Sequence, residues 1–157
     1  MDEKQLRKER IMREQRIARK CEDMLTSALR SNISSLGFKE HISVKNQKKI
    51  SDAFAESNFS RASKRGWGEQ LGFQTLNIVM EKHGFIQHYG VDRTRKSDST
   101  GKYEKRRSFH LYIEKRPFIT EAIKKSKVIE YAAQELGGAK AEYIMKSLAY
   151  ILNKFDK

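Results

Sequence analysis

The sequence has one cysteine, one proline and no long apolar run. Cys21 alone excludes an internal disulfide framework, which is consistent with a reducing compartment. The longest uninterrupted apolar stretch is far too short to span a membrane, and the charged N-terminus lacks the apolar core of a signal peptide. We therefore expect a cytoplasmic protein, neither secreted nor embedded in a membrane.

The sequence also lacks the motifs of common enzymes. There is no phosphate-binding loop, Gly-rich dinucleotide motif, cluster of paired carboxylates or Ser-His-Asp order. His88 and His110 have no third ligand at a spacing typical of a metal site. We expect no enzymatic activity, no cofactor and no bound metal.

Positive charge is what the sequence has in excess. The 157 residues include 33 Lys and Arg against 20 Asp and Glu, a formal net charge of +13, and 38% of them are hydrophobic. That length and apolar content suit one domain, 1–157, with its own core. The charge favours a polyanionic partner, either nucleic acid or an anionic membrane, although it could also serve only to keep the protein in solution.

Long helices are predicted at both ends of the chain. Residues 4–36 carry a wide apolar stripe at spacings of three and four and end before Gly37. The first sixteen residues form either a solvated extension of this helix or a disordered basic arm. After Pro117, two further helices are expected at 118–136 and 139–155, separated by Gly137 and Gly138.

The middle of the chain is predicted to hold two helices and one hairpin. Short helices are expected at 46–57 and at 70–83, the second ended by Gly84. Apolar residues then alternate in 85–93 and 107–114, which predicts antiparallel strands. One face should be covered, and the other should turn outward. The covered face would hold Val91, Phe109, Tyr89 and Leu111; the outward face would hold His88, His110 and Tyr112. The predicted class is mainly α with one β-hairpin (α+β).

The stretch LNIVMEKHGFIQHYGVDRTR resembles the end of a recognition helix leading into the wing of a winged helix-turn-helix domain. The elements shared with such domains are Glu81, Lys82, Gly84, Phe85 and Ile86, followed by Asp92, Arg93 and Arg95. The order of elements is also similar to MarR-type regulators, in which N- and C-terminal helices build a dimer. The resemblance implies a helical extension at 1–36, a winged-helix-like core at 47–114 with its wing at 85–114, and a helical pair at 118–157.

Candidate contacts to nucleic acid fall into three groups. Gln70, Gln74 and Asn77 would share one face of the expected helix, where Gln and Asn can read adenine in the major groove. Three cations precede that helix, and seven more surround the hairpin tip, where they could contact phosphates. The cations are Arg61, Lys64, Arg65, Arg93, Arg95, Lys96, Lys102, Lys105, Arg106 and Arg107.

These patterns favour a nucleoid-associated protein that binds double-stranded DNA with some sequence preference, as a dimeric regulator or as a plasmid or phage accessory factor. The terminal apolar stripes should pack on each other or across a two-fold axis of a homodimer. Two alternatives stay open. One is an RNA-binding protein that uses the same basic hairpin, and the other is a helical assembly protein without a nucleic-acid role.

Overall fold

A computed structural model describes residues 3–37, 49–64, 67–96 and 108–155. Within these ranges it leaves out the side chains of residues 3, 60–64, 67–71, 95–96, 108–109 and 149–155. The chain is mainly helical, and its strands form separate two-stranded antiparallel sheets, so the predicted α+β class is confirmed. Among the residues described, no helix has the length and apolar character needed to cross a membrane.

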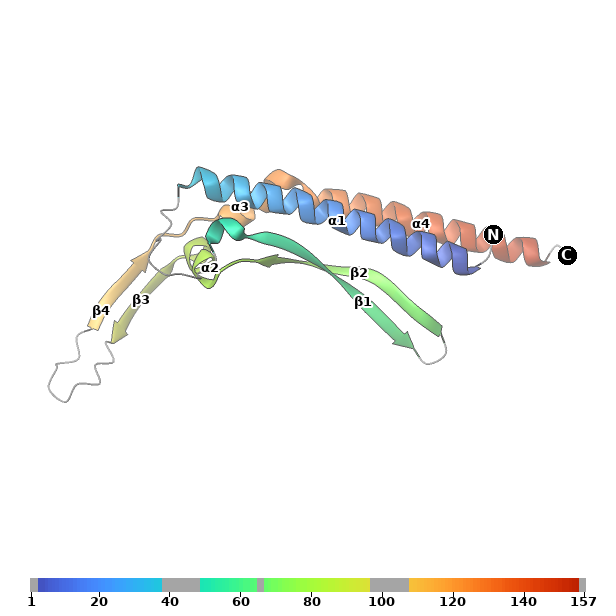
Figure 1. The fold of residues 1–157 in the computed structure, drawn as a ribbon, viewed down its shortest axis with the longest axis horizontal. Coiled ribbons are helices and arrows are strands. Elements are labelled where there is room, and N and C mark those ends of the chain that lie inside the picture. Colours follow the sequence, from blue (N-terminus) through green and yellow to red (C-terminus); the bar gives the residue numbers. More distant parts are fainter. Residues whose placement is uncertain (1–2, 38–48, 65–66, 97–107, 156–157) are drawn as a thin grey trace.

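Two long antiparallel helices form one layer of the molecule (Figure 1). The first, α1 (Glu3–Ser35), buries Ile17, Cys21, Leu25, Leu29 and Ile33, each one turn beyond the last, so the predicted apolar stripe is confirmed. It is helical through the basic first sixteen residues as far as they are described. The second, α4 (Val128–Phe155), packs along α1 and places both chain ends at the same end of the molecule.

The break between the last two helices lies ten residues before the predicted Gly137–Gly138 pair. Helix α3 (Phe118–Ser126) ends at Lys127, which adopts a left-handed conformation with φ of 50°, and α4 begins at the next residue. Both glycines lie exposed inside α4. A glycine costs a helix only about 1 kcal/mol relative to alanine, so the packing of α4 on α1 can keep the helix continuous.

The predicted helices at 46–57 and 70–83 are wrong. A 3-10 turn, η1 (Ile50–Asp52), leads into strand β1 (Phe54–Lys64), which pairs antiparallel with β2 (Trp67–Val79). The helical spacing in 70–83 competed with an alternation of Leu76, Ile78 and Met80, whose side chains all pack against the core. The alternation prevailed because α1 covers that face of the hairpin.

Side chains of α1 bind backbone groups of the β1–β2 hairpin. The N–H of Ser57 donates to Glu22 Oε1 at 2.6 Å and the N–H of Ala55 to Thr26 Oγ1 at 2.9 Å. The Arg30 side chain donates to the carbonyl of Ala53 at 3.3 Å. Four helical residues rise about 6 Å and two strand residues about 6.8 Å, so successive turns of α1 meet alternate residues of β1. Groups that an edge strand leaves open are thereby satisfied.

The strand predicted for 85–93 is wrong over 85–89, because these residues lie in helix α2 (Lys82–Tyr89). Gly84 belongs to its first turn and does not end a preceding helix. A Cβ at Gly84 would lie 2.7 Å from Met80 Sδ, so a larger residue there would have to displace the methionine side chain. The residue that ends α2 is Gly90, with φ of 75° and ψ of 171°, a region that only glycine occupies readily.

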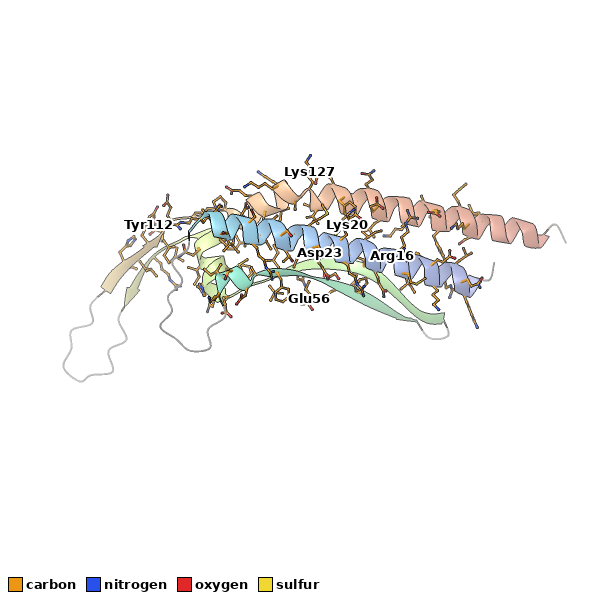
Figure 2. The ribbon with its side chains drawn as sticks, turned by 45° about the horizontal axis from the view of Figure 1, so that its top comes forward. Arg16, Lys20, Asp23, Glu56, Tyr112 and Lys127 are labelled. Atoms are coloured by element: carbon orange, nitrogen blue, oxygen red, sulfur yellow. The ribbon has the colours of Figure 1, made fainter. Side chains whose placement is uncertain are left out.

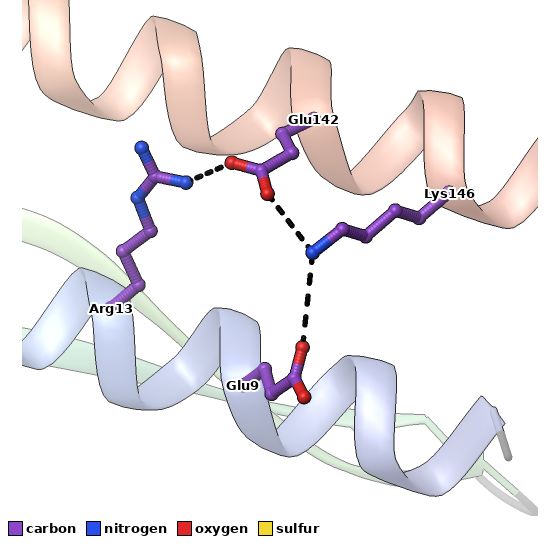
Figure 3. Close-up of polar contacts among 4 residues, drawn as sticks. All are labelled: Glu9, Arg13, Glu142 and Lys146. Carbon is purple, nitrogen blue, oxygen red and sulfur yellow. Dashed lines mark hydrogen bonds and ion pairs between the residues drawn. The ribbon is translucent and has the colours of Figure 1, made fainter. Parts of the chain in front are cut away.

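Charged residues hold α1 and α4 in register (Figure 3). Arg13 on α1 binds Glu142 on α4, and Lys146 lies 2.9 Å from Glu142 and 4.0 Å from Glu9. The hydrogen bond from Lys146, with Arg13 adding to it, lowers the pKa of the Glu142 carboxyl. Because these side chains are exposed, the cluster fixes the pairing of the helices more than it adds stability.

Candidate nucleic-acid interface

A second antiparallel ribbon extends from the end of the molecule opposite the chain termini (Figure 1). Strand β3 (Val91–Lys96) pairs with β4 (Ser108–Ile113), beginning with Val91 opposite Ile113. The pairing predicted between these segments is confirmed from Val91 onward. By this register Val91 and Leu111 share one face with Arg93, and the first two were predicted to lie together. The side chain of Phe109 lies outside those described, and Tyr89 belongs to α2 and is 68% exposed.

The opposite face of the ribbon is polar and open to solvent. Asp92 pairs across the strands with Tyr112, and Thr94 pairs with His110. The Nε2 of His110 lies 2.7 Å from Asp92 Oδ1. Tyr112, which is labelled at this end of the molecule in Figure 2, is 67% exposed. The outward placement of His110 and Tyr112 is therefore confirmed. Their predicted companion on this face, His88, is not there.

His88 is 4% exposed in α2 and belongs to the core. Its Nδ1 accepts the N–H of Ile119 at 3.3 Å, and its ring meets Phe118 edge to face with the centroids 5.5 Å apart. Burial lowers the pKa of this imidazole, against a smaller raising effect of its backbone contact with Arg116. His88 therefore fixes the base of the ribbon and offers no surface to a ligand.

The base of the ribbon is a tight junction. A Cβ at Gly90 would lie 2.8 Å from the carbonyl oxygen of Ile113 and 3.1 Å from the nitrogen of Lys115. Just beyond, the N–H of Arg116 donates to the carbonyl of Gln87 at 3.0 Å. The C-terminal end of α2 and the chain leaving β4 are thereby held against each other.

Two exposed tyrosines border a hollow at this junction. It has a volume of about 220 Å³, and Tyr89 contributes from the last position of α2 while Tyr112 contributes from β4. Asp92 and Lys115 add one charge of each sign to its lining. The sequence analysis missed Tyr89 and Lys115. Had Gly90 been recognised as the residue ending a helix, Tyr89 would have been placed at the junction.

No protein-family model, curated protein or solved structure matches this chain. The function must therefore be argued from the site.

The predicted contact residues do not gather on one element. Asn77 is exposed on the outer face of β2, and Gln74 is exposed where the β1–β2 register shifts by one residue. Arg93 is exposed on β3. Arg61, Lys64, Gln70, Arg95 and Lys96 lie in strands without described side chains, and Arg65, Lys102, Lys105, Arg106 and Arg107 lie outside the described residues.

The helical face on which Gln70, Gln74 and Asn77 were expected to act together is therefore wrong. In β2, Gln74 is itself the unpaired residue at the register shift, and Asn77 lies three residues further along the strand. A strand also occupies the place that the winged-helix resemblance assigned to a recognition helix. Among the described parts, the paired ribbon and the long helices near both ends of the chain are the elements of that comparison that the structure also contains.

A larger hollow, of about 330 Å³, lies between α1 and α4, and most of the charged side chains that line it are engaged with neighbouring residues. Arg13 and Lys146 form the network with Glu142 described above. The guanidinium of Arg10 lies 4.6 Å from the centre of the Tyr143 ring and 3.6 Å from Glu14. The hollow therefore belongs to the contact between the two helices. Among the described residues, no group of three or more His, Cys, Asp or Glu side chains could hold a metal ion.

Proposed function

We propose that the protein binds double-stranded DNA through the β3–β4 ribbon. The observation that supports this most directly is a two-stranded antiparallel ribbon, with Arg93 exposed on it, extending away from the helical body. Its sequence from 91 to 113 contains seven Lys and Arg against three acids. A major groove about 12 Å wide admits such a ribbon, and cations on it contact phosphates.

The proposal does not involve a recognition helix. Proteins that read DNA with a ribbon use side chains from one face of the strands. On the exposed face of this ribbon, Thr94 and His110 are directly opposite each other and can donate or accept hydrogen bonds. Sequence preference would come from these side chains. Arg93 pairs with Leu111 on the other face of the ribbon, so it would add affinity by contacting phosphates and would not read bases.

The salt dependence of binding tests this proposal. Arg93 and Arg95 should be replaced together by alanine, and the affinity for a labelled duplex should be measured by fluorescence anisotropy at several salt concentrations. Each lost phosphate contact lowers the slope of log affinity against log salt by about 0.9, so the double variant should lose about 1.8. A control pair of exposed cations on α1, Lys8→Ala with Arg19→Ala, removes the same charge and should leave the slope near wild type. Equal losses in both pairs would show that the ribbon has no special role.

We also propose that the protein forms a homodimer through the outer face of α4. Ile144, Met145 and Leu148 on this face are 56, 68 and 51% exposed. On the same side of the helix, one and two turns before Ile144, lie the small residues Ala141 and Gly137. A Cβ built on Gly137 meets nothing within 4 Å. If α4 packs antiparallel on α4 of a second copy about a two-fold axis, the half with large side chains on each helix meets the half with small residues on the other. A two-fold interface needs this kind of self-complementarity.

A further inference from the structure

The hollow at the base of the ribbon combines flat apolar rings with charge. Tyr89 and Tyr112 are 68% and 67% exposed, far more than large aromatic side chains in a core. Each contributes to a hollow of about 220 Å³ that also contains Asp92 and Lys115. Pockets that enclose whole small-molecule ligands have volumes of roughly 300–1,000 Å³, so this open hollow suits one flat ring system at its surface.

The rings are attached to parts of the backbone that cannot easily separate. Tyr89 immediately precedes Gly90, whose contact with Ile113 leaves no room for a Cβ. The ring of Tyr89 also meets the buried His88 edge to face, with the centroids 4.7 Å apart. Tyr112 is held by its strand pairing with Asp92. The backbone that carries the two rings is thus held in place without a ligand, so only the side chains need to be ordered when one binds.

We infer that this hollow binds an unpaired nucleobase, stacked on Tyr112 and Tyr89, at the foot of the basic ribbon. Base stacking on aromatic side chains is how proteins hold unpaired bases, and cations beside the rings contact the backbone. Lys115 provides such a cation here, and the Asp92 carboxylate can accept a hydrogen bond from a base amino group. This inference rests on the proposed binding of nucleic acid, and it adds that the site prefers strands in which some bases are unpaired.

The charge around the hollow favours a nucleic acid over an apolar segment of protein. The ribbon above it carries an excess of cations in its sequence, and Lys115 and Arg116 follow directly below. A partner that offered only apolar side chains would leave Asp92 and Lys115 beside it without water. A strand with a phosphate on each nucleotide places its negative charge near the cations and its flat bases near the rings.

The test compares two single strands of equal length and equal phosphate number, an oligodeoxycytidylate and its fully abasic counterpart. Full-length protein should bind the base-bearing strand about 5- to 150-fold more tightly, the range expected when stacking on one aromatic side chain is lost. Tyr112→Ala should remove most of this preference and keep the salt slope, whereas Tyr112→Phe should retain it. Phe54→Ala, which removes an exposed aromatic ring from β1, is the matched control and should also retain it.

The possible results separate this inference from the proposed function. If duplex and both single strands bind with a steep salt dependence but without a preference for bases, the ribbon binds phosphates and the inference is wrong. The same conclusion follows if Tyr112→Ala keeps the preference or if Phe54→Ala loses it equally. If no strand and no duplex binds at low salt, both the proposed function and the inference are wrong. Because Tyr112 is largely exposed, its variants should have the melting temperature of the wild-type protein, which circular dichroism can measure.

Discussion

Replacing Thr26 by valine tests whether α1 really holds the β1–β2 hairpin. Thr26 Oγ1 accepts the backbone N–H of Ala55 at 2.9 Å, and Ala55 is only 6% exposed. Valine has nearly the shape of threonine and a similar helix propensity, so the change removes the acceptor and little else. A buried N–H left without a partner costs about 1–3 kcal/mol. The free energy of unfolding should fall by that amount.

Urea unfolding followed by circular dichroism measures the difference, with the slope against urea expected to stay unchanged. Thr120→Val is the matched control, because Thr120 is an exposed helical threonine on α3. That change should alter the free energy of unfolding by less than about 0.5 kcal/mol. If Thr26→Val and Thr120→Val behave alike, the hydrogen bonds between α1 and β1 do not contribute to stability, and the explanation given for the hairpin's position is wrong.

Three further outcomes are expected. Because burial lowers the pKa of His88, the unfolded chain binds more protons below about pH 6.5, so stability is complete above that pH and falls as pH decreases. His88→Gln should therefore lose less melting temperature on acidification than wild type, and equal losses would contradict this account. Leu148→Glu should convert the proposed dimer to a monomer in light scattering, and an unchanged mass would refute an interface through α4. Gly90→Ala should lower the free energy of unfolding by about 1–3 kcal/mol, whereas Gly138→Ala, with open space around it, should raise it by about 0.5–1 kcal/mol, a contrast that chemical denaturation can check.

The helical layer was predictable because its signals are local and repeated. The spacing of Ile17, Cys21, Leu25 and Leu29 continues over several turns, and no strand pattern competes with it. The break between α3 and α4 was not predictable in the same way. Lys127 ends α3 in a left-handed conformation that lysine rarely prefers, and the two glycines that do favour breaks are kept helical by packing.

The β1–β2 hairpin could not be predicted because it depends on a distant part of the chain. Residues 70–83 satisfy both a helical and an alternating pattern, and α1, some fifty residues earlier, decides between them by covering Leu76 and Ile78. Only the strand residues of the candidate site could be predicted, because the others depend on where a helix ends. Alternation placed His110 and Tyr112 on one exposed face, whereas Tyr89 depends on where α2 ends.

The match between α1 and β1 also limits how far such a contact can run. Each step gains about 0.8 Å more along the strand than along the helix, so two steps from Arg30 to Glu22 accumulate about 1.6 Å. One further turn of α1 and two further residues of β1 would pair Ala18 with Phe59. Alanine has no side-chain group that could accept a hydrogen bond, and the β1–β2 register shifts at Phe59. The following contact is made instead by β2, whose Phe73 N–H donates to Glu14 at 3.0 Å. The rise per contact differs between helix and strand, so a longer hairpin of this kind would need a further bulge to bring its backbone groups level again with the side chains of α1.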